Sequence, residues 1–130
     1  MAIATPRRVA TIGVILWMAL IFALSSQSTL PATGGLPANL VAVDGHLLAY
    51  SVLAALIRLA IGGTEHNRRA DLLAIALATL YGVSDEFHQS FVPGRDASVF
   101  DLAVDLAAAA LGTTLVNLAR AIRVPGTGGG

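Results

Sequence analysis

Cysteine and lysine are both absent from this chain of 130 residues. Without cysteine, the chain can form neither a disulfide nor a thiolate metal site. Charged residues of all kinds are scarce: they make up 12% of the chain, which is about half the share found in soluble domains. The formal net charge is zero, which excludes a generally basic protein. We therefore expect no nucleic-acid partner.

Hydrophobic residues make up 55% of the chain. A chain this short cannot bury so much apolar surface against itself, because small domains bury the smallest fraction of their surface. A lipid bilayer removes this difficulty, since apolar side chains then face acyl chains instead of water. We therefore expect a membrane protein whose first partner is the lipid bilayer.

Four apolar stretches predict an all-α membrane bundle of four transmembrane helices. A helix needs about 20 residues to cross the hydrocarbon core, so the shorter stretches reach across only with polar residues at one end among the headgroups. The tail 124–130 is glycine-rich and is predicted to be disordered. The expected spans, within one membrane domain over residues 1–123, are about 9–25, 46–62, 71–88 and 99–119.

Arginines alternate with the loops and predict an orientation. Two of the loops between spans, Ser25 to Gly45 and about Asp85 to Ser98, contain a single arginine, Arg95. The other arginines outside the spans lie in pairs on the opposite side. The positive-inside rule then places both termini in the cytoplasm. The pairs on the cytoplasmic side are Arg7 with Arg8, Arg68 with Arg69, and Arg120 with Arg123.

The first span has an alternative interpretation. Arg7 and Arg8, followed by an apolar stretch and Ala23-Leu24-Ser25, also resemble a secretory signal peptide. Cleavage would leave three spans and an external N-terminus. The polar residues would keep their side of the membrane in either case.

With this topology, nearly all unusual polar residues fall at the external end, where a bundle can gather them into one pocket. Glu86 with His88 and Asp101 offers the carboxylate and imidazole groups that general acid–base catalysis uses. We expect these three to be the catalytic residues if the protein is an enzyme, although the sequence does not decide that question. The expected substrate-binding residues are Ser26, Gln27, His46, Tyr50, Gln89, Arg95 and Asp105.

Asp101 and Asp105 are four residues apart, so both carboxylates lie on one helical face. Ionised groups inside a membrane are costly and are usually paired. These two carboxylates therefore need Arg95, a histidine, a cation or a shared proton. Alternatively, Asp101 caps its helix at the membrane interface and Asp105 is hydrogen-bonded to a serine or threonine.

Two arginines and the histidines have open alternatives. Arg95, in the turn that follows Pro93 and Gly94, is expected either to bind an anionic headgroup or to pair with Asp101 or Glu86. Arg58, inside the second span, is expected to extend to the cytoplasmic side. The two histidines of the external end, with Glu86 and an aspartate, are a plausible ligand set for zinc, but their spacing fits no standard metal motif. We therefore expect no metal and no cofactor.

These motifs resemble those of VanZ-like proteins, over about residues 12–116. The resemblance rests on the run from Tyr81 to Arg95 followed by Ser98 and Asp101, on Ser25-Ser26-Gln27-Ser28, and on His46 four residues before Tyr50. It implies a four-helix protein integral to the bacterial cytoplasmic membrane. Relatives often have a lysine where this chain has Val43, an asparagine where it has Asp105 and a glycine where it has Val116.

The resemblance also implies a role in the cell envelope. Founding members are associated with resistance to teicoplanin, a glycopeptide that bears a lipid chain. We expect an outward-facing pocket that binds or modifies a lipid-linked envelope component or a lipoglycopeptide. A non-catalytic scaffold that binds a partner is the alternative. A carrier is least favoured, because the chain has no inverted repeat. The sequence assigns no oligomeric state.

Overall fold

The computed structural model describes residues 6–29, 34–35 and 37–123. Within these ranges the chain is all-α, without strands. The predicted disordered tail 124–130 lies outside the described residues. The helices are α1 (Pro6–Ser25), α2 (Ala38–Gly62), α3 (Arg68–Gln89) and α4 (Val99–Arg123).

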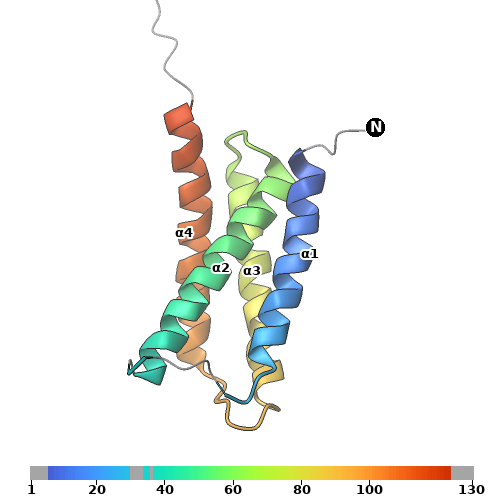
Figure 1. The fold of residues 1–130 in the computed structure, drawn as a ribbon. Helices are drawn as coiled ribbons and strands as arrows, with labels where there is room; N and C mark the ends of the chain where they lie inside the picture. The colour runs from blue at the N-terminus through green and yellow to red at the C-terminus, as the bar shows by residue number, and fades with distance from the viewer. Residues whose placement is uncertain (1–5, 30–33, 36, 124–130) are drawn as a thin grey trace, which may run out of the picture.

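The four helices run alternately up and down, so α1 and α3 end where α2 and α4 begin (Figure 1). We call the end of the bundle that holds His46, Glu86 and Asp101 the polar end. The opposite end, which holds Arg68 and Arg120, is the arginine end. The alternation gathers the arginine pairs of the sequence at one end of the bundle and Arg95 at the other.

Three of the described helices are long and apolar enough to cross a membrane, namely Pro6–Ser25, Leu40–Gly62 and Val99–Arg123. Helix α3 is not among them, because polar residues occupy both of its ends, from Arg68 to Asp71 and from Ser84 to Gln89. Large apolar side chains such as Leu16 and Leu80 remain exposed on the outside of the bundle. This surface suits contact with lipid rather than water.

Helix α2 begins at Ala38, well before the span expected at residue 46. Pro37 precedes it with φ −57°, and the fixed φ of proline suits the start of a helix. As a result, Asp44 and Gly45 lie on the helix, although the sequence analysis had placed them in a loop. His46 therefore projects from within a helix rather than from its first turn.

Small residues let the helices approach closely. On α3 the buried face repeats every four residues from Ala70 through Ala78 to Gly82. At Gly112 of α4, an added Cβ would overlap the carbonyl oxygen of Ser51 on α2. Close approach through small residues is a common way in which membrane helices pack. The buried core around these contacts includes Tyr50, Leu53, Ala54, Ala74 and Ala108.

Arg58 reaches the arginine end as expected, but it is enclosed there rather than exposed. Its side chain is fully buried, and its guanidinium forms an ion pair with Asp71 and donates to the carbonyl of Gly63 at 3.0 Å. Asn117 of α4 donates to the same carboxylate, also at 3.0 Å. Arg58 is buried at this end because Asp71 and the carbonyls that follow α2 offer it partners inside the bundle.

Candidate functional site

His46 occupies the centre of the polar end. Its Nδ1 lies 2.8 Å from Oδ1 of Asp105, and the Asp105 side chain is fully buried. Among the partners that the sequence allows for Asp105, the structure has a histidine rather than a serine or threonine. Gly82 makes room for this carboxylate, because a Cβ at that position would lie 2.6 Å from Oδ2 of Asp105.

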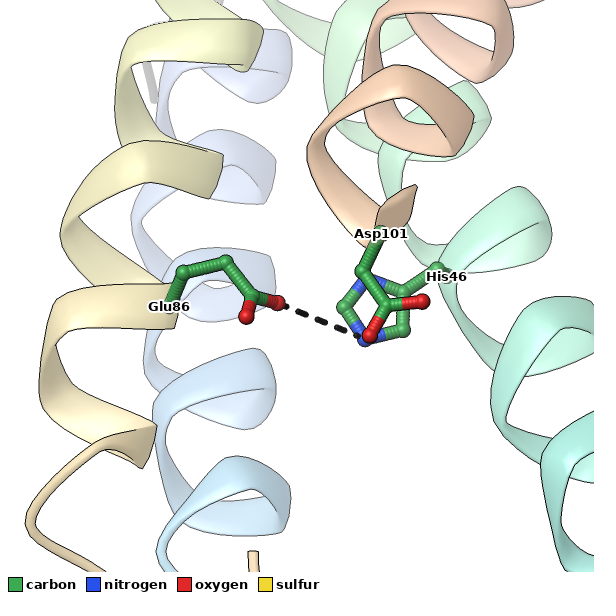
Figure 2. Close-up of side chains that lie close together, drawn as sticks. All are labelled: His46, Glu86 and Asp101. Atoms are coloured by element: carbon green, nitrogen blue, oxygen red, sulfur yellow. Dashed lines mark ion pairs between the residues drawn. The ribbon is translucent and has the colours of Figure 1, made fainter. Parts of the chain in front are cut away.

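Glu86 approaches His46 from helix α3. Its Oε1 lies 3.9 Å from Nε2 of His46, and Figure 2 shows the two side chains facing each other with Asp101 beside the imidazole. The backbone N–H of Ser98 donates to Oε2 of Glu86 at 2.7 Å. Glu86 is 5% exposed, and its Oε1 has no hydrogen-bond partner within the described part of the chain.

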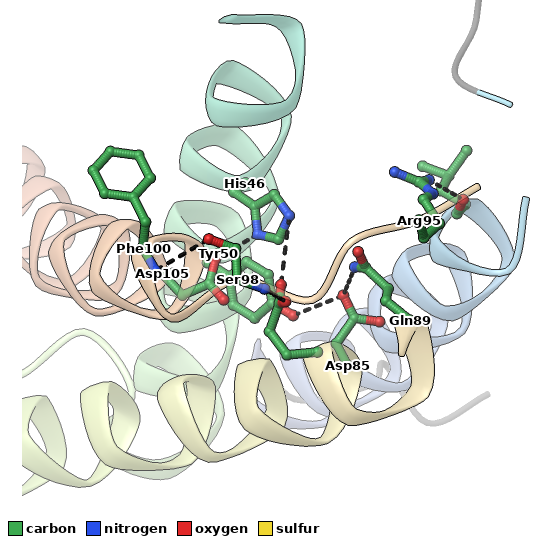
Figure 3. A network of polar contacts seen from close by, with 10 residues as sticks. His46, Tyr50, Asp85, Gln89, Arg95, Ser98, Phe100 and Asp105 are labelled. Carbon is green, nitrogen blue, oxygen red and sulfur yellow. Dashed lines mark hydrogen bonds and ion pairs between the residues drawn. The ribbon is translucent and has the colours of Figure 1, made fainter. Parts of the chain in front are cut away.

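Asp85 forms a second group of contacts one residue before Glu86. It accepts hydrogen bonds from the Tyr50 hydroxyl at 3.3 Å and from Nε2 of Gln89 at 2.9 Å (Figure 3). Asp85 and Ser98 were not among the predicted site residues. Their signal was present, since Asp85 lies four residues before Gln89 in the same polar run and Ser98 belongs to the motif that ends at Asp101.

Arg95 donates hydrogen bonds to backbone carbonyls at and just beyond the end of α1. It donates from Nε to the carbonyl of Gln27 and from Nη2 to the carbonyl of Leu24, each at 2.9 Å. Leu24 lies in the last turn of α1, whose carbonyls have no partner inside the helix, and Gln27 follows two residues after the helix ends at Ser25. Gly94 allows the turn, because its φ is +80° and glycine adopts such values freely. Arg95 therefore pairs with neither Asp101 nor Glu86.

His88 lies apart from the His46 group. Its Nε2 is 2.9 Å from the Ser26 hydroxyl, and its ring stacks on Phe22 at a centroid distance of 4.5 Å. Both partners belong to the α1 side of the bundle. The fold thus separates Glu86 from His88, and it brings Glu86 to His46 instead.

A cavity of about 260 Å³ opens at the polar end between α1, α2 and α3. Its lining combines apolar residues such as Ile21 and Val41 with polar residues. A separate apolar groove of about 700 Å³ runs along α1 and α3, from Thr11 to Phe87. The polar residues that line the cavity are Ser25, Gln27, His46, Tyr50, Asp85, Gln89 and Arg95.

Most of the predicted site residues therefore meet at the polar end. His46, Glu86, Asp101 and Asp105 form one group, while Tyr50, Gln89, Gln27 and Arg95 line the adjoining cavity. Ser26 and His88 form a separate pair.

Comparison with known proteins gives a match to a family model. The family model described as VanZ/LLP1 matches residues 10–120 of the chain. No curated protein and no solved structure matches it.

Proposed function

Because this chain belongs to the VanZ/LLP1 family and carries helices able to cross a membrane, we propose that its pocket faces outward and binds or modifies a lipid-linked envelope component or a lipoglycopeptide. In this proposal residues 1–123 form one membrane domain with four spans in the bacterial cytoplasmic membrane. Both termini are cytoplasmic. The protein thereby lowers exposure of the cell to teicoplanin-like drugs.

The distribution of arginine supports the orientation. Arg68, Arg69, Arg120 and Arg123 belong to the arginine end, and Arg95 belongs to the polar end. Since cytoplasmic loops carry the excess of arginine, the arginine end is cytoplasmic and the polar end is external. Helix α3 crosses the membrane with its polar ends at the two interfaces.

The observation that carries the proposal is that one bundle holds both a cavity with several hydrogen-bonding groups and a separate apolar groove. The cavity of about 260 Å³ presents hydrogen-bonding groups, and the groove of about 700 Å³ offers a surface for an acyl chain. Ligand pockets commonly combine an apolar wall with a few polar groups that fix orientation. A molecule with a polar head and a lipid tail has this same division.

If the site is catalytic, the pair that the geometry supports is Glu86 with His46 rather than Glu86 with His88. The 3.9 Å between Oε1 of Glu86 and Nε2 of His46 leaves both groups near one reacting atom or one water molecule. Asp105 orients the imidazole from its other nitrogen. A carboxylate that fixes a histidine in this way is typical of acid–base sites.

A non-catalytic scaffold is the second candidate. The bonds from Tyr50 and Gln89 to Asp85, and from Ser98 to Glu86, join α2, α3 and the start of α4. Polar contacts of this kind hold membrane helices together without any ligand. A scaffold therefore tolerates loss of a single carboxylate charge, whereas a binding site or an active site does not.

The experiment compares inhibition by teicoplanin with inhibition by vancomycin, which lacks the lipid chain. A susceptible bacterium expresses the native chain, Glu86→Gln or Asp96→Asn at equal membrane abundance. The Asp96→Asn control removes an exposed carboxylate of the same end. We expect the native chain and Asp96→Asn to raise the inhibitory concentration of teicoplanin alone, and Glu86→Gln to lose that protection.

Two results would contradict the proposal. Equal protection by Glu86→Gln and the native chain would favour the scaffold. Absence of protection by the native chain, with the protein present in the membrane, would remove lipoglycopeptides as the ligand.

A further inference from the structure

Three helices bring one imidazole nitrogen and two carboxylate oxygens close together at the polar end. His46 of α2, Glu86 of α3 and Asp101 of α4 each offer one ligand atom, and these atoms lie within 4.8 Å of one another (Figure 2). Imidazole nitrogen and carboxylate oxygen are ligands that borderline divalent cations such as Zn²⁺ accept. Binding of an ion requires these atoms to come closer together, because each ligand of Zn²⁺ lies about 2.0–2.2 Å from the ion.

The hydrogen bonds around His46 and Glu86 leave one ligand atom of each available for a cation, namely Nε2 of His46 and Oε1 of Glu86. His46 uses Nδ1 toward Asp105, and a carboxylate partner requires that this nitrogen donates. In the neutral imidazole Nε2 then carries the lone pair, and Nε2 is the atom that faces Glu86. Histidines that bind metals almost always donate their other N–H to a carboxylate or a carbonyl.

Glu86 is arranged in the same way. Its Oε2 is held by the backbone N–H of Ser98, while Oε1 points toward His46. This oxygen has no hydrogen-bond partner within the described part of the chain although the side chain is 5% exposed. A buried carboxylate oxygen without a donor is costly, and a cation between Glu86 and His46 would remove that cost.

Charge points to the same conclusion. The polar end gathers the carboxylates of Glu86, Asp101 and Asp105 around His46, with that of Asp85 on the neighbouring Tyr50. Arg95 is turned toward backbone carbonyls at the end of α1. Buried carboxylates in a membrane protein are normally paired with a positive charge. A divalent cation supplies two.

We propose that His46, Glu86 and Asp101 bind one divalent cation of the zinc class at the polar end. Asp105 and the backbone N–H of Ser98 position His46 and Glu86 as ligands. Three protein ligands leave at least one coordination position for water or for an anionic ligand, and the adjoining cavity, which His46 also lines, gives access to it.

The sequence alone predicts no metal site at these residues, because the ligand spacing matches no standard motif. The spacing is uninformative here, since each ligand comes from a different helix. The proposal is also independent of the lipid ligand proposed above, because cation binding is measured without any lipid-linked molecule.

The test is titration of Zn²⁺ into the purified full-length chain, stripped of metal and held in lipid nanodiscs at neutral pH, against a chromophoric chelator. We expect one tight site per chain. Glu86→Gln and Asp101→Asn each weaken binding ~100-fold or more, because a ligand is lost. Asp105→Asn weakens it ~10-fold, because only the orientation of His46 is affected.

Matched controls separate this site from adventitious binding and from misfolding. His88→Gln removes another histidine of the same end, and Asp96→Asn removes an exposed carboxylate; both keep native affinity. Circular dichroism verifies that each variant keeps its helical content. The proposal is overturned if Glu86→Gln, folded, binds Zn²⁺ as the native chain does, or if His88→Gln loses as much affinity as Asp101→Asn.

Discussion

At the arginine end of the bundle, one fully buried cation meets one carboxylate: Arg58 pairs with Asp71, and Asn117 adds a hydrogen bond to the same carboxylate. At the polar end, Glu86, Asp101 and Asp105 surround the single imidazole of His46. The first arrangement is balanced in charge. Within the described residues, both ends hold buried polar atoms without a hydrogen-bond partner: Oδ1 of Asn117 and Nε of Arg120 at the arginine end, and carboxylate oxygens of Asp85, Glu86 and Asp105 at the polar end. What distinguishes the polar end is its excess of negative charge. Balanced charge suits a contact that only stabilises the fold, whereas an excess of negative charge is typical of a site that binds a cation.

The largest expected effect comes from breaking the balanced end. Arg58→Met leaves Asp71 without its cation and leaves the carbonyl of Gly63 without its donor. Breaking one partner of a buried ion pair costs about 3 kcal/mol or more, and we expect a loss of that size in the free energy of unfolding in detergent. The double variant Arg58→Met with Asp71→Leu recovers most of it, because no lone charge remains buried.

Arg69→Gln is the control, since that arginine is exposed at the same end. If Arg58→Met and Arg69→Gln unfold at the same denaturant concentration, the buried pair does not stabilise the arginine end.

A smaller effect is expected from filling the space at a glycine, which tests the two ends against each other. Gly62 makes room for Arg58 at the arginine end, and Gly82 makes room for Asp105 at the polar end. An added Cβ lies 2.5 Å from Nη1 of Arg58 at Gly62 and 2.6 Å from Oδ2 of Asp105 at Gly82. Overpacking of this kind costs about 1–3 kcal/mol. We expect both Gly62→Ala and Gly82→Ala to lower the free energy of unfolding, and only Gly82→Ala to weaken Zn²⁺ binding.

Gly45→Ala is the matched control, because no atom lies within 4 Å of a Cβ added there and alanine favours a helix. It should be neutral or slightly stabilising. Unchanged Zn²⁺ affinity in Gly82→Ala would argue against a role for Asp105 in positioning His46.

The smallest effect concerns Arg95, which belongs to the polar end but acts on the backbone. Arg95→Gln removes hydrogen bonds to the carbonyls of Leu24 and Gln27, and such bonds contribute about 1 kcal/mol. We expect a loss of that size in the free energy of unfolding and no change in Zn²⁺ affinity. Arg8→Gln, exposed at the other end of α1, is the control. A change in Zn²⁺ affinity without a change in stability would show that Arg95 belongs to the binding site instead.

Much of the fold follows from the sequence alone. The apolar stretches predicted four transmembrane helices, and the described residues form four helices, of which three are long and apolar enough to cross a membrane. That α3 also crosses stays a prediction. The family that the motifs resembled is confirmed by the match over residues 10–120. The start of α2 was missed, because the segment after Pro37 lacks the long apolar run that marks a span and yet forms helix from Ala38.

The partners of individual side chains could not be predicted in the same way. The spacing of Asp101 and Asp105 on one helical face indicated a need for a positive partner, but it did not select His46 over Arg95. Glu86 and His88 are two residues apart in the sequence, and a helix directs such residues to different faces. Glu86 consequently faces His46, and His88 faces Ser26.

The sequence by itself indicated a lipid environment, the helices, and the separation of arginines from carboxylates. It could do so because hydropathy, helical length and charge are properties of local segments. The tertiary structure decided that Arg58 is enclosed, that Arg95 caps α1, and that three ligand atoms converge near His46. Those outcomes depend on how the helices are rotated about their axes and how closely they approach. Rotation and approach are set by contacts such as Gly82 with Asp105 and Gly112 with Ser51, which join residues far apart in the chain.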